Sequence, residues 1–263
     1  MVKRFLTGFI ALLLFVPVLY FSETIAFPII IGLLSAFSVY EFAACIGFFS
    51  KKMNYLLPVV LMAFLAPITA RIEPNWLILL GFLVFIYLLF LTVFGYDKIH
   101  IDSISTLLYG FIYTAVGFAF LVMVRDMAPE RYLLIFIAAW CTDTFAYMGG
   151  RLFGKRKLCP NLSPKKTVAG AVSGIVGTVC GFVVFGIITV SLGGSFNFVK
   201  YCIFAVLGSV VAQIGDLSAS AIKRHYGVKD YGSLFPGHGG VIDRFDSVLP
   251  LSLGAYLALS LVI

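Results

Sequence analysis

Long runs of apolar residues alternate with short polar segments along the whole chain. Each run extends over roughly 17 to 25 residues, enough for an α-helix to cross about 30 Å of hydrocarbon, whereas barrel strands would be short segments of alternating polarity. We therefore expect an all-α fold, a polytopic integral membrane protein. Nine spans are predicted, at about 5–21, 25–49, 55–70, 76–96, 104–124, 131–150, 167–192, 200–222 and 247–263.

The composition supports this class. Hydrophobic residues make up 61% of the chain and charged residues only 12%, which does not fit a soluble surface. Lys3 and Arg4 precede the first apolar run, but no convincing small-residue cleavage site follows it, so we interpret the run as a retained helix. The five cysteines are isolated, without C-x-x-C spacing, and predict neither a zinc site nor a disulfide framework.

The positive charges indicate an orientation. With nine spans and a cytoplasmic N-terminus, 15 of the 19 Lys and Arg residues fall on the cytoplasmic side, and only Arg71, Arg125, Arg131 and Lys200 fall outside. This asymmetry matches the positive-inside rule. The net charge of +7 is therefore a topology signal and implies no nucleic acid partner. We expect a multi-pass protein of the inner (plasma) membrane.

The polar residues divide the chain into two regions, 1–130 and 131–263. The first consists of membrane helices with short loops, and Glu41 is its exceptional intramembrane carboxylate. Such a group is a functional candidate, although a position about ten residues before Lys51 also fits the membrane interface. The second region contains two long predicted cytoplasmic loops, 151–166 and 223–246, and we expect the active site there.

Two segments of the second region carry polar side chains at span ends. Asp143 lies in the sixth span, where an unpaired carboxylate is costly, so it requires a cation or hydrogen-bond donors; a structural bond across helices, with Thr142 or Thr144 nearby, is the alternative. Polar residues directly before the next span suit a phosphate chain at a helix N-terminus, or a basic anchor for anionic lipid. They are Asn161, Ser163, Lys165, Lys166 and Thr167.

A third segment runs from the eighth span into a glycine-rich loop. Gln213, Asp216, Ser220 and Lys223 follow helical spacing and predict one polar helix face. Asp243 and Asp246 are three residues apart and would be neighbours if the ninth helix began before Ser247.

These acids suggest a metal site. Asp216, Asp243 and Asp246 supply only oxygen ligands, which favour a hard cation such as Mg²⁺ shared with substrate phosphates. His238 lacks a second His or Cys at ligand spacing, which argues against zinc. The loop FPGHGG allows close approach of backbone to a polyphosphate, although most such loops are only turns. Acids, cations and glycines together favour phosphoryl or nucleotidyl transfer.

The string SASAIKRHYGVKDYGSLFPGHGGVIDRFD, residues 218–246, resembles the signature of the phosphatidate cytidylyltransferase family, and the close match covers about residues 140–250. The upstream SPKKTVAG and DTFAY are also similar to that family, although Phe145 replaces the expected small residue. The signature positions are Ser218, Ile222, Lys223, Arg224, Lys229, Asp230, Gly232, Phe235, Pro236, His238, Gly239, Gly240, Asp243, Arg244 and Asp246.

The resemblance implies that CTP and phosphatidic acid give CDP-diacylglycerol and pyrophosphate, with Mg²⁺ required, in a homodimer at the membrane. We expect Asp216, Lys223, Arg224, Asp243 and Asp246 to be catalytic. The substrate-binding candidates are Asp143, Asn161, Ser163, Lys165, Lys166, Thr167, Ser220, Lys229, Asp230, His238, Gly239, Gly240 and Arg244. The alternatives are a membrane transporter and an enzyme acting on an isoprenoid lipid.

Overall fold

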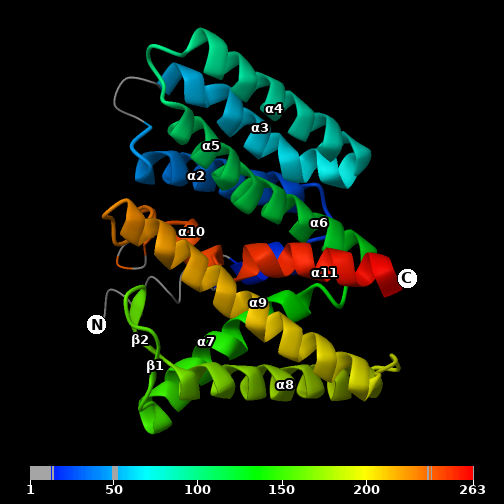
Figure 1. Cartoon of the computed structure of the whole chain (residues 1–263). Coiled ribbons are helices and arrows are strands. Elements are labelled where there is room, and N and C mark those ends of the chain that lie inside the picture. Colours follow the sequence, from blue (N-terminus) through cyan, green and yellow to red (C-terminus); the bar gives the residue numbers. More distant parts are fainter. Residues whose placement is uncertain (1–12, 14, 49–52, 236, 238, 263) are drawn as a thin grey trace. The chain divides into compact units, whose positions relative to one another are not determined.

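The computed structural model confirms the all-α class (Figure 1). It describes residues 13, 15–48, 53–235, 237 and 239–262. Seven helices in this part of the chain are long and apolar enough to cross a membrane, and a shorter apolar helix lies near the C-terminus. Eight predicted spans thus correspond to observed helices, whereas the predicted span 5–21 falls largely outside the described residues.

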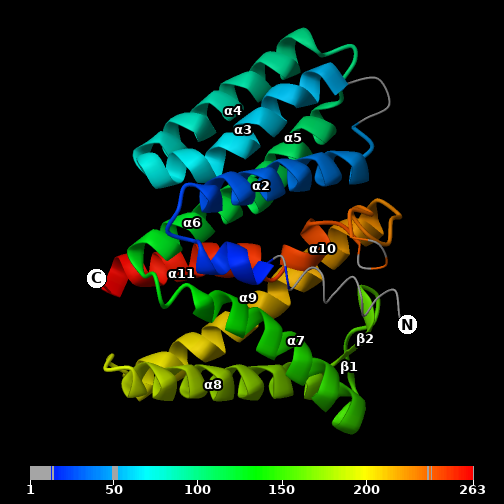
Figure 2. The same cartoon turned by 180° about the vertical axis from the view of Figure 1, so that it is seen from behind.

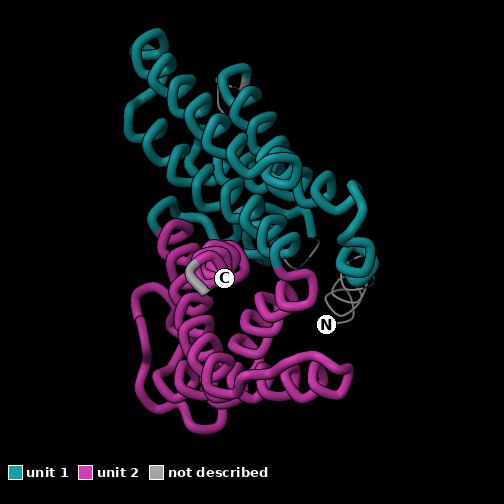
Figure 3. The backbone as a smooth tube through the Cα atoms, turned by 90° about the vertical axis from the view of Figure 1, so that its right-hand side faces the viewer, with its two compact units in different colours: residues 1–127, 225–245 teal, residues 128–224, 246–263 magenta. Residues whose placement is uncertain are grey.

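The chain divides into two compact units, shown in different colours in Figure 3. Unit 1 contains residues 1–127 and 225–245, and unit 2 contains residues 128–224 and 246–263. The first break lies close to the predicted boundary at residue 130. The glycine-rich loop, which the sequence grouped with the second region, packs with the first unit.

Unit 1 is a bundle of long apolar helices (Figure 2). The short helix α10 packs against α2. Residues 101–127 form one continuous span in which η1, a π-helical turn, joins α5 to α6. The elements are α2 (Ala26–Cys45), α3 (Met53–Ile72), α4 (Asn75–Phe94), α5 (Ile101–Phe111), η1 (Ile112–Val116), α6 (Gly117–Met127) and α10 (Ile242–Phe245).

Two arginines that the topology places outside lie together in unit 1. The Arg71 guanidinium is 3.6 Å from Asp126, and Arg125 is 3.1 Å from the same carboxylate oxygen. Arg71 also donates to the backbone carbonyls of Ser22, at 2.8 Å, and Glu23, at 2.6 Å. Because these contacts join the C-terminal ends of α3 and α6 to the N-terminal side of α2, they agree with the predicted placement of both arginines on one side.

Unit 2 contains four helices and a β-hairpin. The elements are α7 (Leu133–Phe153), β1 (Lys157–Cys159), β2 (Ser163–Thr167), α8 (Val168–Ser191), α9 (Phe198–His225, whose last residue belongs to unit 1) and α11 (Val248–Val262). The hairpin occupies the predicted loop 151–166 and was not expected from the sequence; β1 and β2 pair antiparallel.

Small residues bring α7 and α8 into close contact. A Cβ atom on Gly170 would lie 2.7 Å from the Ala146 carbonyl oxygen, and one on Gly174 would lie 3.0 Å from that of Thr142. Small residues at such spacing let helix backbones approach where no hydrophobic effect drives helices together in lipid. The pairing fixes the C-terminal end of α7 beside the N-terminal end of α8, where the predicted polar residues are located.

Candidate active site

The centre of the polar site in unit 2 is an ion pair between β2 and α9. Lys166 on β2 contacts the Oδ2 atom of Asp216, and Ser220 donates to Oδ1 of the same carboxylate at 3.4 Å. The side chains of Lys166 and Asp216 are 28% and 26% exposed, so both can still reach a ligand. The helical spacing of Asp216 and Ser220 thus places them together, as predicted.

Asp246 belongs to the same cluster. Burial among protein atoms, followed by the negative charges of Asp216 and Asp143, raises the pKa of Asp246 to about 7, and nearby Lys223 opposes that change. Loss of hydration and nearby negative charges both disfavour the ionised form of a carboxyl group, so the two effects add. The site therefore holds three acids, Asp143, Asp216 and Asp246, with an excess of negative charge beside the Lys166 and Lys223 ammonium groups.

A glycine explains how Asp246 comes close to α9. A Cβ atom on Gly215 would lie 2.5 Å from the backbone oxygen of Asp246 and 2.5 Å from Pro250. Only a residue without a side chain permits this approach next to Asp216. Gly215 could not be predicted as part of the site, because its role depends on a contact with the distant segment of Asp246 and Pro250.

The condition under which Asp243 and Asp246 would be neighbours on the ninth helix is not met. The ninth helix, α11, begins at Val248, and α10 ends at Phe245. Asp246 lies in the turn between them, where its Oδ1 atom accepts a hydrogen bond from the Ser247 amide at 2.8 Å. This bond gives the Ser247 amide a side-chain partner just before α11. A turn at residues 246–247 therefore separates α10 from α11.

Asp243 has a different set of contacts, within unit 1. Its Oδ2 atom accepts hydrogen bonds from the amides of Tyr231, at 2.8 Å, and Gly240, at 2.9 Å. The carboxylate thus ties the two ends of the glycine-rich loop together. This structural role was not predicted from the sequence.

The residues before α8 adopt an ordered entry to the helix. Thr167 has extended backbone angles, and its hydroxyl accepts a hydrogen bond from the Gly170 amide at 3.1 Å. Its neighbours Ser163 and Lys165 lie on β2, and Asn161 lies in the turn of the hairpin. Lys165 and Asn161 are exposed, whereas Lys166 turns to Asp216. The segment therefore presents cations beside a helix N-terminus, which favours anions.

Four charged residues predicted to belong to the site are exposed to solvent. Arg224 ends the unit 2 part of α9, and Lys229, Asp230 and Arg244 lie on the unit 1 segment 225–245; all four are exposed. Gly239 adopts a positive φ of 84° and pairs with Phe235. His238 lies outside the described residues.

A buried hydroxyl cluster joins three helices of unit 2 below the acidic site. The Thr142 oxygen is 2.8 Å from that of Thr178 on α8 and donates to Ser209 on α9 at 2.9 Å. Gln213 adds a 3.2 Å bond to the Ala171 carbonyl of α8. These contacts are bonds across helices, of the kind considered for the segment around Asp143. They align the faces of α7, α8 and α9 that carry the site.

Replacing Thr142 with Val is expected to lower the free energy of unfolding by about 0.5–2 kcal/mol, because the substitution keeps the shape but leaves Ser209 and Thr178 without this partner. Thermal unfolding in detergent measures the loss. Thr189→Val is the matched control, since the Thr189 hydroxyl donates to the Phe185 carbonyl within its own helix. Equal melting temperatures for the two variants would contradict the expectation.

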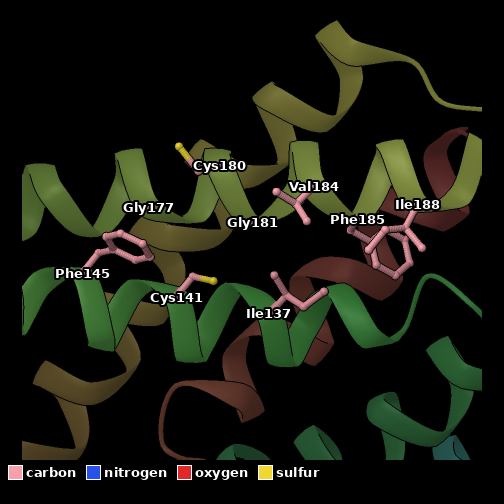
Figure 4. A pocket seen from close by; sticks show the side chains of 9 residues that line it. All are labelled: Ile137, Cys141, Phe145, Gly177, Cys180, Gly181, Val184, Phe185 and Ile188. Carbon is pink, nitrogen blue, oxygen red and sulfur yellow. The ribbon is translucent and has the colours of Figure 1, made fainter.

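An apolar groove of about 390 Å³ lies between α7 and α8 (Figure 4). Its lining comes from the facing sides of the two helices and includes Phe145, two positions after Asp143. The lining residues are Ile137, Cys141, Phe145, Gly177, Cys180, Gly181, Val184, Phe185 and Ile188. Hydrocarbon is the ligand that such a lining accommodates best.

The acidic cluster has the chemistry of a divalent-cation site. Among the residues described, no three or more His, Cys, Asp or Glu side chains lie close enough together to hold a metal ion as they stand. The ligand atoms of Asp143, Asp216 and Asp246 are nevertheless all oxygen, and the pKa of Asp246 is raised first by burial and then by repulsion from the charges of Asp216 and Asp143. A hard cation would relieve that repulsion, so these residues fit Mg²⁺ chemically.

Comparison with known proteins agrees with this chemistry. Residues 2–262 match the family model described as "Cytidylyltransferase family". Proteins named phosphatidate cytidylyltransferase are similar over nearly the whole length. The protein of Staphylococcus haemolyticus is 32% identical over 258 residues, covering 94% of this chain and 96% of its own. Those of Staphylococcus saprophyticus and Staphylococcus aureus are 34% and 33% identical, with the same coverage of 94% and 96%. The chain therefore belongs to the cytidylyltransferase family.

Proposed function

We propose that the protein transfers the cytidylyl group of CTP to phosphatidic acid, giving CDP-diacylglycerol and pyrophosphate. Three relatives similar over 94% of the chain carry the name of this enzyme. The observation that carries the proposal is the cluster of Asp143, Lys166, Asp216 and Asp246, in which a lysine and three acids gather at the ends of membrane helices.

The reaction needs little covalent help from the protein. An oxygen of the phosphatidate phosphate attacks the α-phosphorus of CTP, a new phosphorus–oxygen bond forms, and the bond from the α-phosphorus to the bridging oxygen breaks. Pyrophosphate leaves with that electron pair. A phosphate monoester is already largely ionised near neutral pH, so no strong general base is required. Positioning and charge neutralisation supply most of the rate.

The cations of unit 2 fit the phosphates. Lys166 lies beside the N-terminal end of α8. Lys223 lies on α9, near Asp246. When a triphosphate binds, Lys166 exchanges its contact with Asp216 for a phosphate oxygen. Asp216 is then available for another cation, which couples nucleotide binding to the acidic cluster.

Mg²⁺ is the proposed cofactor, and Asp216 and Asp246 would hold it together with Asp143. Asp143 here replaces Asp243 of the set expected from the sequence, because the Asp243 carboxylate accepts hydrogen bonds from the Tyr231 and Gly240 amides. When bound, the ion supplies neutralising charge for the triphosphate and the pyrophosphate. The protein groups keep their own tasks: the carboxylates collect positive charge at one place, and the buried hydroxyl cluster of Thr142 holds the three helices in register.

The lipid substrate matches the apolar part of unit 2. The groove between α7 and α8 gives acyl chains a hydrocarbon surface, and its residue Phe145 follows Asp143 closely. A lipid phosphate and a soluble nucleotide meet only at a membrane surface, and we place the site at the cytoplasmic one.

Labelling of the lipid product tests the function. Purified protein is mixed with CTP radiolabelled in the cytidine, phosphatidic acid and Mg²⁺, and the lipid is then extracted. We expect label in the lipid, no label when Mg²⁺ is replaced by EDTA, and none with labelled GTP. Label in a polyprenyl phosphate but not in phosphatidate would establish the isoprenoid alternative, and no label in either lipid would overturn the proposal.

A further inference from the structure

Glu41, in the membrane helix α2, contacts the glycine-rich loop about 200 positions later in the chain. Its side chain is buried, with 6% of the residue exposed. The Oε2 atom accepts a hydrogen bond from the Ile242 amide at 3.2 Å, and the Val241 amide also donates to this carboxyl group. A buried carboxylate is costly unless donors satisfy it, and these amides are such donors.

Together, Glu41 and Asp243 bind a consecutive run of loop amides. Gly240 donates to Asp243 at 2.9 Å, and the next two amides, of Val241 and Ile242, donate to Glu41. Such a run of amides is able to bind an anion, as the sequence suggested for a polyphosphate. In this loop the anions are two side chains of the protein.

The glycines of the loop fit the two carboxylates. A Cβ atom on Gly232 or Gly240 would overlap the carboxyl group of Glu41. One on Gly239 would lie 2.7 Å from Oδ2 of Asp243. The carboxyl groups of Glu41 and Asp243 therefore require glycine at these three positions, independently of any contact with a substrate.

The ring of Tyr231 fixes the same region from the apolar side. It stacks on Phe42, the residue after Glu41, with centroids 6.0 Å apart and an interplanar angle of 19°. The Tyr231 amide is also held by Asp243. Adjacent residues of α2 thus hold the two ends of the loop, Glu41 at residues 241–242 and Phe42 at residue 231.

We propose that Glu41 is a positioning residue for the glycine-rich loop: it holds the backbone amides of residues 241 and 242 and thereby orders the segment that carries Lys229, Asp230 and Arg244. The effect on catalysis rests on the function proposed above, whereas the effect on loop order does not. Glu41 touches none of the reacting groups in this assignment; it acts through the loop backbone.

Glu41→Gln provides the first test. The amide side chain has nearly the same shape but presents N–H groups toward backbone donors, so we expect kcat to fall at least tenfold. Hydrogen–deuterium exchange on the purified protein should be faster in residues 230–245 and unchanged in α8. Glu130→Gln is the control, because Glu130 is exposed. Wild-type exchange at 230–245 together with near-normal kcat would overturn the proposal, and an inactive wild-type protein would instead overturn the proposed function.

A double-mutant cycle tests whether the loop glycines are required by Glu41 or by a substrate that contacts the loop backbone. Gly232→Ala alone should lower kcat because its methyl group overlaps the Glu41 carboxyl group. Glu41→Ala creates room for that methyl group, so the two losses should not multiply in the double variant. Gly81→Ala is the control, since nothing lies within 4 Å of a Cβ atom there. Losses that multiply would show that Gly232 and Glu41 act independently and would contradict the proposal, even if Glu41→Gln proved unstable.

Discussion

Asp246→Asn is expected to lower the turnover of lipid labelling by about 100-fold or more, the scale seen when a group that stabilises transition-state charge is removed. The variant keeps the size of the side chain but removes one of three neighbouring acids. The cluster of Asp143, Asp216 and Asp246 would then collect less positive charge near the phosphates. Steady-state kinetics with saturating CTP and phosphatidate measure the effect.

The same substitution should leave the protein folded and, in EDTA at pH 8, slightly more stable. The pKa of Asp246 is raised from 3.8 to about 7 in the folded protein, so the fold binds the proton more tightly than the unfolded chain does. The contribution of this group to stability therefore falls as pH rises from about 4 to 7, and Asn removes that unfavourable term. A thermal scan in detergent measures it.

Asp97→Asn is the control, because Asp97 is exposed in a turn of unit 1. It should change neither turnover nor melting temperature. Near-normal turnover of Asp246→Asn would contradict the role of Asp246. A large loss of stability would show instead that the carboxylate is needed for folding.

The membrane helices could be predicted because hydropathy and length depend on local sequence alone. Eight of the nine expected spans have helical counterparts, and α3 continues through Pro58 and Pro67 without a break. Prolines are tolerated in such helices when neighbouring groups satisfy the freed backbone carbonyls. The hairpin of β1 and β2 could not be predicted, because its strands are short and polar and pair only once the chain turns back beside α8.

The same distinction applies to the site: contacts within one helix could be predicted from residue spacing, whereas contacts between distant segments could not. The spacing of Asp216 and Ser220 predicted a shared helix face, and the structure brings them together. The ion pair from Lys166, the approach of Asp246 across Gly215 and the contact of Glu41 with Ile242 each join segments far apart in the chain. A single sequence carries no periodicity for such pairs. Glu41 had one signal, a carboxylate within an apolar run, but nothing identified its partner.

Lys166→Gln is expected to raise the KM for CTP by about tenfold, equivalent to about 1.4 kcal/mol of binding free energy. The glutamine keeps much of the length and polarity but has no charge, so a charge-assisted bond to a phosphate oxygen is lost. Because Lys166 pairs with Asp216 when no nucleotide is bound, its removal has a second consequence. Asp216 becomes available to a cation without competition, and the Mg²⁺ concentration for half-maximal activity should fall.

Kinetics as a function of both CTP and Mg²⁺ separate the two tasks of this lysine. A higher KM for CTP shows contact with the nucleotide, whereas a lower Mg²⁺ requirement with unchanged KM would show that Lys166 only neutralises Asp216 and would contradict its role in phosphate binding. Lys157→Gln is the matched control, since Lys157 is exposed on the partner strand β1 of the same hairpin. It should change neither parameter. An equal effect of both variants would indicate a general loss of positive charge, because long-range attraction of CTP depends on total charge rather than on the contact with Asp216.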